Sequence, residues 1–398
     1  MNMEKHPYRV RGFKAAGGAC GLKKNGAHDL ALIFSEREAA AAGVFTTNRV
    51  QAAPVALSRE GVRRGRARAI LANSGNANAC TGPAGMRDAR AMAQLAARSL
   101  GVEPEGVLVA STGVIGAPLD MGALETGIPR LAEGLSPDGL REAASAIMTT
   151  DRFPKLSVHE GTAASVAYRI VGVAKGAGMI MPNMATMLCF VVSDIRIGAE
   201  PLQETLSAAV RSTFNRITVD GDTSTNDMVL VLANGAAENP EPRGEDLAAF
   251  EHGLVRVMGD LARMIVRDGE GATKLVRLEV RGATSAAEAE RAARTVANSA
   301  LVKTAFYGGD PNWGRIMGAL GRADIDMDES LVDIWVQDVQ IVSGGMGMGR
   351  DAEREAALKM AGEEFGVTIH LNMGGFQDRI YTCDLTHDYV SINADYRT

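Results

Sequence analysis

The chain has 398 residues, 46% of them hydrophobic, which is enough for a large core and for two domains or one long α/β unit. Its formal net charge of -6 argues against a nucleic-acid partner, because proteins that bind polyanions usually present a basic surface, and we therefore expect a small substrate. No stretch approaches the ~18 to 20 consecutive apolar residues of a membrane span, and the N-terminus lacks the apolar core of a signal peptide, so we expect a cytoplasmic protein without a membrane partner.

Short apolar runs alternate with helical patterns through the first two thirds of the chain. The runs that predict buried strands are residues 30–34, 69–71, 107–110, 187–192 and 228–232. Residues 86–100 carry apolar side chains at helical spacing, and residues 201–214 begin with a proline in a favoured first-turn position, so both predict helices. Residues 239–245 contain two prolines and predict an exposed loop. This alternation is typical of the α/β class.

The pattern changes near residue 273. Residues 275–281 alternate like a half-exposed strand, and Ser285 with Glu288 then forms a capping box at the start of an alanine-rich helix. Residues 332–342 predict a second alternating strand, and residues 351–365 predict an amphipathic helix. The second part of the chain is therefore expected to be a smaller α+β domain.

The run KGAGMIMPNMATML, residues 175–188, places a threonine between a glycine-rich turn and a buried strand. If the Thr186 hydroxyl attacks the carbonyl of Ala185, an N-to-O acyl shift gives an ester, and hydrolysis of that ester frees Thr186 as a new N-terminus. A terminal α-amine has a reference pKa near ~8 and suits a general base at neutral pH. On the residues alone, a turn that opens a strand without any chemistry is the commoner explanation.

This run resembles the cleavage motif of the ornithine acetyltransferase family, whose members cut themselves at an Ala-Thr bond in this setting. Six more segments resemble motifs of the family along the chain: residues 43–48, 73–82, 111–116, 214–227, 310–315 and 383–386. The resemblance implies an αββα sandwich of the self-cleaving amidase kind with a smaller C-terminal α+β domain. It also implies α and β chains of residues 1–185 and 186–398. We place the catalytic domain at residues 1–273 and the second domain, whose tail returns to the active site, at 274–398.

The resemblance also assigns roles to individual residues. Thr112 and Gly113 follow the predicted strand 107–110, and the matching Thr-Gly pair of the family supplies the oxyanion hole. On the residues alone, a turn at the end of a strand explains this pair. The substrate contacts that the resemblance implies are Thr149 or Thr150, Lys175, Thr186, Glu270, Asn393 and Thr398.

Two of these residues carry charges that complement a dibasic amino acid. Such a substrate needs a carboxylate near its cationic end and donors near its α-carboxylate, and Glu270 and Lys175 have these charges. Ordinary surface charges are the alternative for both. Arg152 stands where a small polar residue is expected, and this departure leaves the choice between Thr149 and Thr150 open.

Other patterns give no cofactor or metal site. Residues 344–349 lack the GxGxxG spacing, and residues 175–178 are not a phosphate-binding loop. Residues 220–227 resemble a calcium loop without its central glycine and terminal glutamate, so we expect this segment to order active-site backbone. The four cysteines contain no CxxC pair and the six histidines have no metal-binding spacing, so neither a metal nor a cofactor is expected.

We therefore expect an enzyme that moves acetyl from N2-acetylornithine to glutamate, giving ornithine and N-acetylglutamate for arginine biosynthesis, by a ping-pong mechanism through acetyl-Thr186. Use of acetyl-CoA as a second donor stays open. The cleaved chains are expected to associate as α2β2. A self-cleaving amidase or aminopeptidase, with water as the acceptor, is the first alternative. A binding protein that never cleaves is the second.

Overall fold

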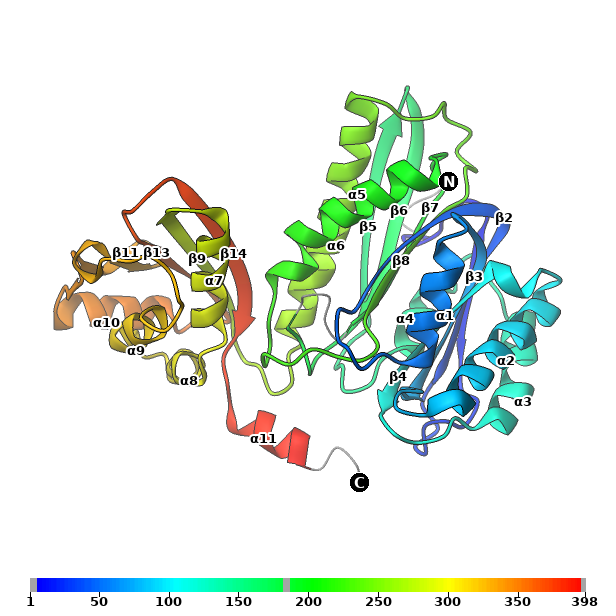
Figure 1. The fold of residues 1–398 in the computed structure, drawn as a ribbon, viewed down its shortest axis with the longest axis horizontal. Helices are drawn as coiled ribbons and strands as arrows, with labels where there is room; N and C mark the ends of the chain where they lie inside the picture. Colours follow the sequence, from blue (N-terminus) through cyan, green and yellow to red (C-terminus); the bar gives the residue numbers. More distant parts are fainter. Residues whose placement is uncertain (1–5, 182–186, 395–398) are drawn as a thin grey trace. The chain divides into compact units, whose positions relative to one another are not determined.

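The structure of this protein, a computed structural model, describes residues 6–181 and 187–394. The chain divides into two units, each made of two segments: residues 1–215 with 222–265, and residues 216–221 with 266–398 (Figure 1). The domain boundary at 273/274 stays a prediction.

The first unit is built around one eight-stranded sheet. Its strands are β1 Phe13–Gly18, β2 Leu30–Phe45, β3 Arg66–Asn76, β4 Val107–Val114, β5 Lys155–Ala163, β6 Val166–Lys175, β7 Leu188–Ser193 and β8 Met228–Ala233. Their order in space is β4-β3-β2-β8-β7-β6-β5, and β1 pairs with β2. The pairs β3 with β4 and β7 with β8 are parallel, and the others are antiparallel. All five apolar runs predicted as strands lie in this sheet, apart from Met187 at the entry of β7.

Strand β2 takes part in two layers. Its first part pairs with β1 and β3, the register with β3 shifts between Phe34 and Ala39, and residues 40–45 pair with β8. Strands β4 and β6 are five positions apart in the strand order, which would be more than ~20 Å in a flat sheet. Yet Lys175 of β6 and Thr112 of β4 are joined by a hydrogen bond of 3.3 Å between Nζ and Oγ1. The sheet is therefore folded into two layers that face each other.

Helices cover the outer faces of both layers. The helices of this unit are α1 Ala53–Val62, α2 Gly82–Leu100, α3 Met121–Glu133, α4 Leu140–Ala146, α5 Ala199–Ser212 and α6 Glu245–Arg267. Met92 of α2 and Leu124 of α3 share a buried cluster with Leu71 of β3. On the other layer, a Cβ on Gly172 of β6 would lie 2.7 Å from Leu261 of α6. Figure 1 shows α2 and α3 on one side of this unit and α5 and α6 on the other.

The space between the layers holds a second buried cluster. Ile70 of β3 and Phe190 of β7 belong to it, as do Leu140 and Ile147 at the two ends of α4. The order of layers is therefore helix, sheet, sheet, helix. This arrangement confirms the predicted fold class, and α2 and α5 confirm the two predicted helices.

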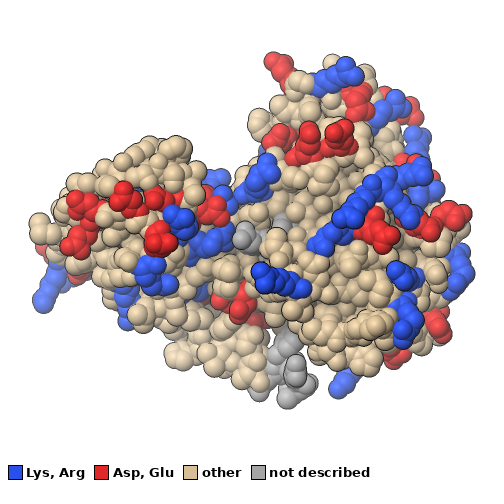
Figure 2. All heavy atoms as spheres, viewed as in Figure 1, with Lys and Arg blue, Asp and Glu red and all other residues tan. Residues whose placement is uncertain are grey.

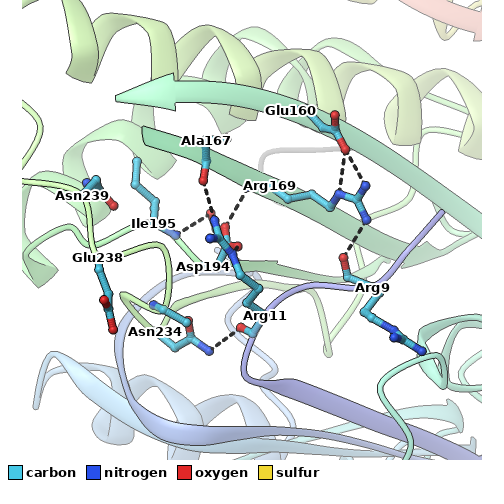
Figure 3. A network of polar contacts seen from close by, with 12 residues as sticks. Arg9, Arg11, Glu160, Ala167, Arg169, Asp194, Ile195, Asn234, Glu238 and Asn239 are labelled. Carbon is cyan, nitrogen blue, oxygen red and sulfur yellow. Dashed lines mark hydrogen bonds and ion pairs between the residues drawn. The ribbon is translucent and has the colours of Figure 1, made fainter. Parts of the chain in front are cut away.

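The far end of β7 is tied to the N-terminal segment by a polar network (Figure 3). Asp194 is buried, with 2% of its surface exposed. Its Oδ1 accepts the backbone N-H of Arg169 at 2.7 Å, and its Oδ2 accepts Nε of Arg11 at 2.5 Å. The Arg169 side chain donates to Glu160 at 2.9 Å and to the carbonyl of Arg9 at 2.8 Å. These bonds fix the ends of β6 and β7 opposite to Lys175.

The second unit has its own sheet and its own core. Its strands are β9 Leu275–Ala283, β10 Asp333–Val336, β11 Val339–Ser343, β12 Met346–Gly347, β13 Glu364–His370 and β14 Phe376–Cys383. Their order is β12-β11-β10-β13-β9-β14, with β13 and β9 parallel. The helices are α7 Ala286–Ala297, α8 Ala300–Gly308, α9 Trp313–Leu320, α10 Arg350–Lys359 and α11 His387–Ala394. The core includes Val276, Ala293, Phe306 and Phe365.

Two predictions for this unit are confirmed and two are wrong. Strand β9 and the N-cap of α7 are confirmed, since the Ser285 hydroxyl accepts the backbone N-H of Glu288 at 3.3 Å. Residues 332–342 are not one strand but the hairpin β10–β11, which turns at Gln337 with a φ of 55°. Residues 351–365 are not one helix, because α10 ends at Lys359 and β13 begins at Glu364.

The surface drawn in Figure 2 carries both signs of charge on each unit, with lysine and arginine side chains next to acidic ones. Within the two described ranges, no helix has the length and apolar character needed to cross a membrane.

Candidate active site

Lys175 is the last residue of β6 and lies at the centre of a polar cluster in the first unit. Its side chain is buried, with 4% of the residue exposed. Its Nζ donates to Oγ1 of Thr149 at 2.8 Å and to Oγ1 of Thr112 at 3.3 Å. The structure thus brings together three of the residues that the sequence singled out. Thr150 is half-buried, and its side chain makes no hydrogen bond to any residue of the described ranges.

Asp151 accepts hydrogen bonds from the backbone around this cluster and from a second lysine. Its Oδ1 accepts Nζ of Lys155 and the backbone N-H of Gly176, both at 2.7 Å, and its Oδ2 accepts the backbone N-H of Thr149 at 2.9 Å. Burial alone would raise the pKa of this carboxyl, but the charges of Lys175 and Lys155 and the hydrogen bonds overcome it and lower the pKa to about 2. Asp151 is therefore an anion at neutral pH that fixes the backbone on both sides of the Lys175 ammonium.

Thr112 and Gly113 lie near the end of β4, where the backbone approaches β3 closely. Gly113 has a φ of +132°, and a Cβ at this position would lie 2.3 Å from the carbonyl carbon of Gly75. Only glycine fits there. Asn226 fixes Ser111, the residue before Thr112, since its Nδ2 donates to the carbonyl of Ser111 at 2.8 Å. The oxyanion role of Thr112 and Gly113 stays a prediction.

Residue 187 enters β7 next to these groups. The backbone N-H of Met187 donates to Oδ1 of Asp227 at 2.8 Å. The next residue, Leu188, is in register with Lys175 on β6 and with Met228 on β8. The predicted nucleophile Thr186 and its bond to Ala185 lie outside the described residues.

The second unit holds two further predicted contacts. Nδ2 of Asn393 donates to Oε2 of Glu270 at 2.8 Å, and 9% of Glu270 is exposed. The Thr386 hydroxyl donates to the carbonyl of Gly271 at 2.7 Å. A Cβ on Gly271 would lie 2.5 Å from the backbone nitrogen of Tyr389, so the 268–271 loop packs directly on the start of α11. The C-terminal segment therefore returns to Glu270. Thr398 lies outside the described residues.

No group of three or more His, Cys, Asp or Glu side chains that could hold a metal ion occurs among residues 6–181 and 187–394. The four cysteines are free thiols, and two of them, Cys189 and Cys383, are buried. The absence of a metal or cofactor stays a prediction.

The sequence pattern gives Asp151 no role, and it gives Asn226 and Asp227 only the general expectation that residues 220–227 order active-site backbone. A usable signal existed for the last two. They directly precede the apolar run 228–232, whose strand β8 pairs in parallel with β7, the strand that follows Thr186 in the chain. Because the two strands are parallel, polar residues at the start of β8 lie at the same edge of the sheet as the start of β7.

The family motifs of the sequence and the layered fold agree with comparisons to known proteins. The ArgJ family model matches residues 14–398. The chain belongs to the ArgJ family. This result confirms the resemblance found in the sequence.

Two ArgJ relatives each match 98% of the chain. The arginine biosynthesis bifunctional protein ArgJ of Geobacter sulfurreducens is 51% identical over 391 residues, which cover 98% of this chain and 100% of the relative. The ArgJ protein of Desulfotalea psychrophila is 50% identical over 391 residues with the same coverage. A crystal structure of ArgJ from Bacillus halodurans superimposes with a TM-score of 0.50 at 43% identity, covering 52% of this chain and 97% of the solved one.

Proposed function

We propose that this ArgJ chain transfers acetyl from N2-acetylornithine to glutamate, giving ornithine and N-acetylglutamate in arginine biosynthesis. The family match over residues 14–398 and the names of the relatives support this function. Among the residues, the main support for this function is the buried Lys175 ammonium. It lies between the hydroxyls of Thr149 and Thr112, beside the start of β7. A buried cation between two hydroxyls suits the binding of a carboxylate or of a developing oxyanion.

The nucleophile in this proposal is Thr186. Its Oγ attacks the carbonyl carbon of the acetyl amide, and the tetrahedral oxyanion receives hydrogen bonds from the Thr112 hydroxyl and the Gly113 N-H. The C-N bond then breaks, the nitrogen takes the proton that left Thr186, and ornithine departs. The α-amine of glutamate next attacks the acetyl ester, the C-O bond breaks, and the Thr186 oxygen regains a proton. The terminal amine of Thr186 carries the proton in both halves.

Lys175 orients the hydroxyl of Thr112 toward the proposed oxyanion. The ammonium donates to the Thr112 oxygen at 3.3 Å, so this hydroxyl accepts with a lone pair and its own hydrogen is left to donate. A hydroxyl with that orientation offers a donor to an oxyanion. The proposed hydroxyl contact of the substrate is Thr149, whose oxygen also accepts from Lys175, or its neighbour Thr150.

The remaining contacts are proposed from the second unit. The Glu270 carboxylate is the proposed partner for the cationic end of the amino acid, and Asn393 orients it through the 2.8 Å hydrogen bond. Thr398 is proposed as a further contact on the basis of the motif alone. Because the relatives are named bifunctional, we include acetyl-CoA as a second donor in the proposal.

Self-cleavage between residues 185 and 186 is part of the same proposal. It would divide the chain into two parts of nearly equal length, which we expect to associate as α2β2. The solved Bacillus halodurans chain, which is matched over 97% of its length by about half of this chain, has the size expected of one such part. The cytoplasm is the proposed compartment.

Intact mass spectrometry of the purified protein, followed by an acetyl-transfer assay, tests this function. We expect two chains, acetyl transfer from acetylornithine to glutamate, and parallel initial-rate plots at several fixed glutamate concentrations. Release of acetate without acetylglutamate would identify an amidase. A single intact chain without turnover would identify a binding protein.

A further inference from the structure

Asn226 and Asp227 are adjacent in the chain but bind two different strands. Oδ1 of Asp227 accepts the backbone N-H of Met187 at 2.8 Å, at the entry of β7. Nδ2 of Asn226 donates to the carbonyls of Ser111, at 2.8 Å, and of Ala77, at 2.6 Å. Ser111 directly precedes Thr112 on β4. The Asn226–Asp227 pair therefore joins the strand that follows residue 186 to the strand of the predicted oxyanion hole.

The pair is itself held in place. The Thr225 hydroxyl donates to Oδ1 of Asn226 at 2.5 Å, and this bond sets the orientation of the Asn226 amide. The backbone carbonyl of Asp227 accepts the N-H of Thr46 at 2.9 Å, and that of Thr225 accepts the N-H of Ala52 at 3.0 Å. Both side chains thus project from a backbone that is fixed on either side, as positioning groups require.

Burial of the Asp227 carboxyl costs free energy that its hydrogen bonds only partly offset. Only 1% of the residue is exposed, and its Oδ2 has no hydrogen-bond partner within the described part of the chain. Burial raises the pKa of this carboxyl well above its ordinary value, against the Met187 hydrogen bond and the charge of Lys175. A buried unpaired oxygen costs ~1 to 3 kcal/mol, and such groups call for a functional explanation.

We propose that Asn226 and Asp227 are positioning residues for self-cleavage and acetyl transfer. The Asp227 carboxyl fixes the backbone N-H of Met187, the residue that follows the proposed nucleophile in the chain, and the Asn226 amide fixes the carbonyl directly before Thr112. The two bonds set the separation between the start of β7 and the proposed oxyanion donors, on which both reactions depend. This inference rests on the proposed function, since it assigns to Thr186 and Thr112 the roles given above.

The decisive comparison uses three variants of the full chain. Asp227→Ala removes the acceptor for Met187, whereas Asp227→Asn retains an acceptor oxygen in a side chain of similar shape. Asp194→Ala is the matched control. Asp194 is equally buried, also accepts a backbone N-H, and lies past the opposite end of β7 (Figure 3).

Cleavage is followed by the appearance of two bands over time after synthesis, and turnover by acetyl transfer from acetylornithine to glutamate. For Asp227→Ala we expect ~10- to 100-fold slower cleavage and a kcat lower by a similar factor with KM nearly unchanged, because a displaced nucleophile costs rate rather than binding. Asp227→Asn should cleave and turn over within ~3-fold of wild type, which is below ~0.7 kcal/mol in barrier height. Asp194→Ala should lower the melting temperature while cleaving at the wild-type rate.

Three outcomes would overturn the inference: wild-type rates in Asp227→Ala, equal slowing in Asp194→Ala, or equal slowing in Asp227→Asn. If Asp227→Ala does not fold, Asn226→Ala tests the other half of the pair. A wild-type kcat in Asn226→Ala would also overturn the inference. Failure of the proposed function looks different. In that case the wild-type chain itself shows neither cleavage nor acetyl transfer.

Discussion

Nζ of Lys175 lies 3.3 Å from Oγ1 of Thr112, although their strands are five positions apart in the sheet. The contact exists because β2 passes from one layer to the other and brings the ends of β4 and β6 face to face. A buried ammonium thereby reaches the hydroxyl that is proposed to bind the oxyanion. The position of this charge leads to the first prediction.

Lys175→Met should abolish most acetyl transfer while the protein still folds. Methionine fills the space of the lysine stem, and Asp151 keeps Lys155 as its counter-charge. Loss of the ammonium leaves Thr112 poorly oriented, and losing one oxyanion donor typically lowers kcat by ~10² to 10³. Steady-state kinetics with acetylornithine and glutamate check this. Lys303→Met is the control, since Lys303 is also buried and donates to Thr382 at 3.2 Å within the second unit. A kcat near that of wild type in Lys175→Met would contradict the prediction.

Gly113→Ala should block both cleavage and transfer. Its Cβ would meet the Gly75 carbonyl carbon at 2.3 Å, so β4 must move away from β3 at the predicted oxyanion hole. A displacement of about 1 Å can cost ~10²-fold in rate. Gly116→Ala is the matched control, because Gly116 also has positive φ, +84°, but open space around it, so ~1 kcal/mol of stability should be lost there without loss of activity. Full cleavage in Gly113→Ala, read on a denaturing gel, would exclude this geometry.

The strands of the first unit could be predicted from the sequence because both faces of its sheet are covered. Continuous apolar runs such as 187–192 and 228–232 occur where neither face meets water, and they give an unambiguous pattern. The family resemblance then supplied the layer order. Local pattern and family motif therefore agreed for this half of the chain.

The second unit was harder because its turns carry no strong signal. The turn at Gln337 and Asp338 contains neither glycine nor proline, so the alternating pattern runs through the hairpin without interruption. The hydrogen bonds of site residues such as Asp227 could not be predicted for a different reason. Their partners, Met187 among them, are distant in the sequence, and hydrogen bonds of this kind leave no local pattern.

Acid should weaken the first unit through Asp151. The folded pKa, about 2, lies below the ordinary value of 3.8, so the folded state holds the proton less tightly than the unfolded state. The resulting stability is present above pH 3.8 and is lost as the pH falls toward 2, by ~2 kcal/mol in total. Asp227, whose folded pKa is raised, keeps its proton in the folded state while the unfolded carboxyl loses it above pH 3.8, so this residue contributes a slope of opposite sign above that pH. Urea unfolding between pH 2 and 5 measures the effect, and Asp151→Asn should flatten it. An equal slope in that variant would assign the acid sensitivity elsewhere.

Asn393→Ala should weaken substrate binding without affecting self-cleavage. Chain ends are usually poorly ordered and tolerant of change, but the Asn393 amide donates to Glu270 at 2.8 Å and to the carbonyl of Tyr389 at 3.0 Å. Loss of one hydrogen bond to a charged group corresponds to ~1.5 to 3 kcal/mol, so KM for acetylornithine should rise by at least ~10-fold. Cleavage needs no substrate and should proceed normally.

The same helix supplies the control for this prediction. Ser391 is exposed, and among the described residues its hydroxyl bonds only to the carbonyl of His387, at 3.4 Å, so Ser391→Ala should keep wild-type kinetics. Deletion of residues 393–398 should raise KM at least as much as Asn393→Ala, because it removes Asn393 together with the proposed Thr398 contact. Both measurements use the purified, cleaved enzyme with acetylornithine varied at saturating glutamate. A wild-type KM in the truncated chain would show that neither Asn393 nor Thr398 belongs to the substrate site.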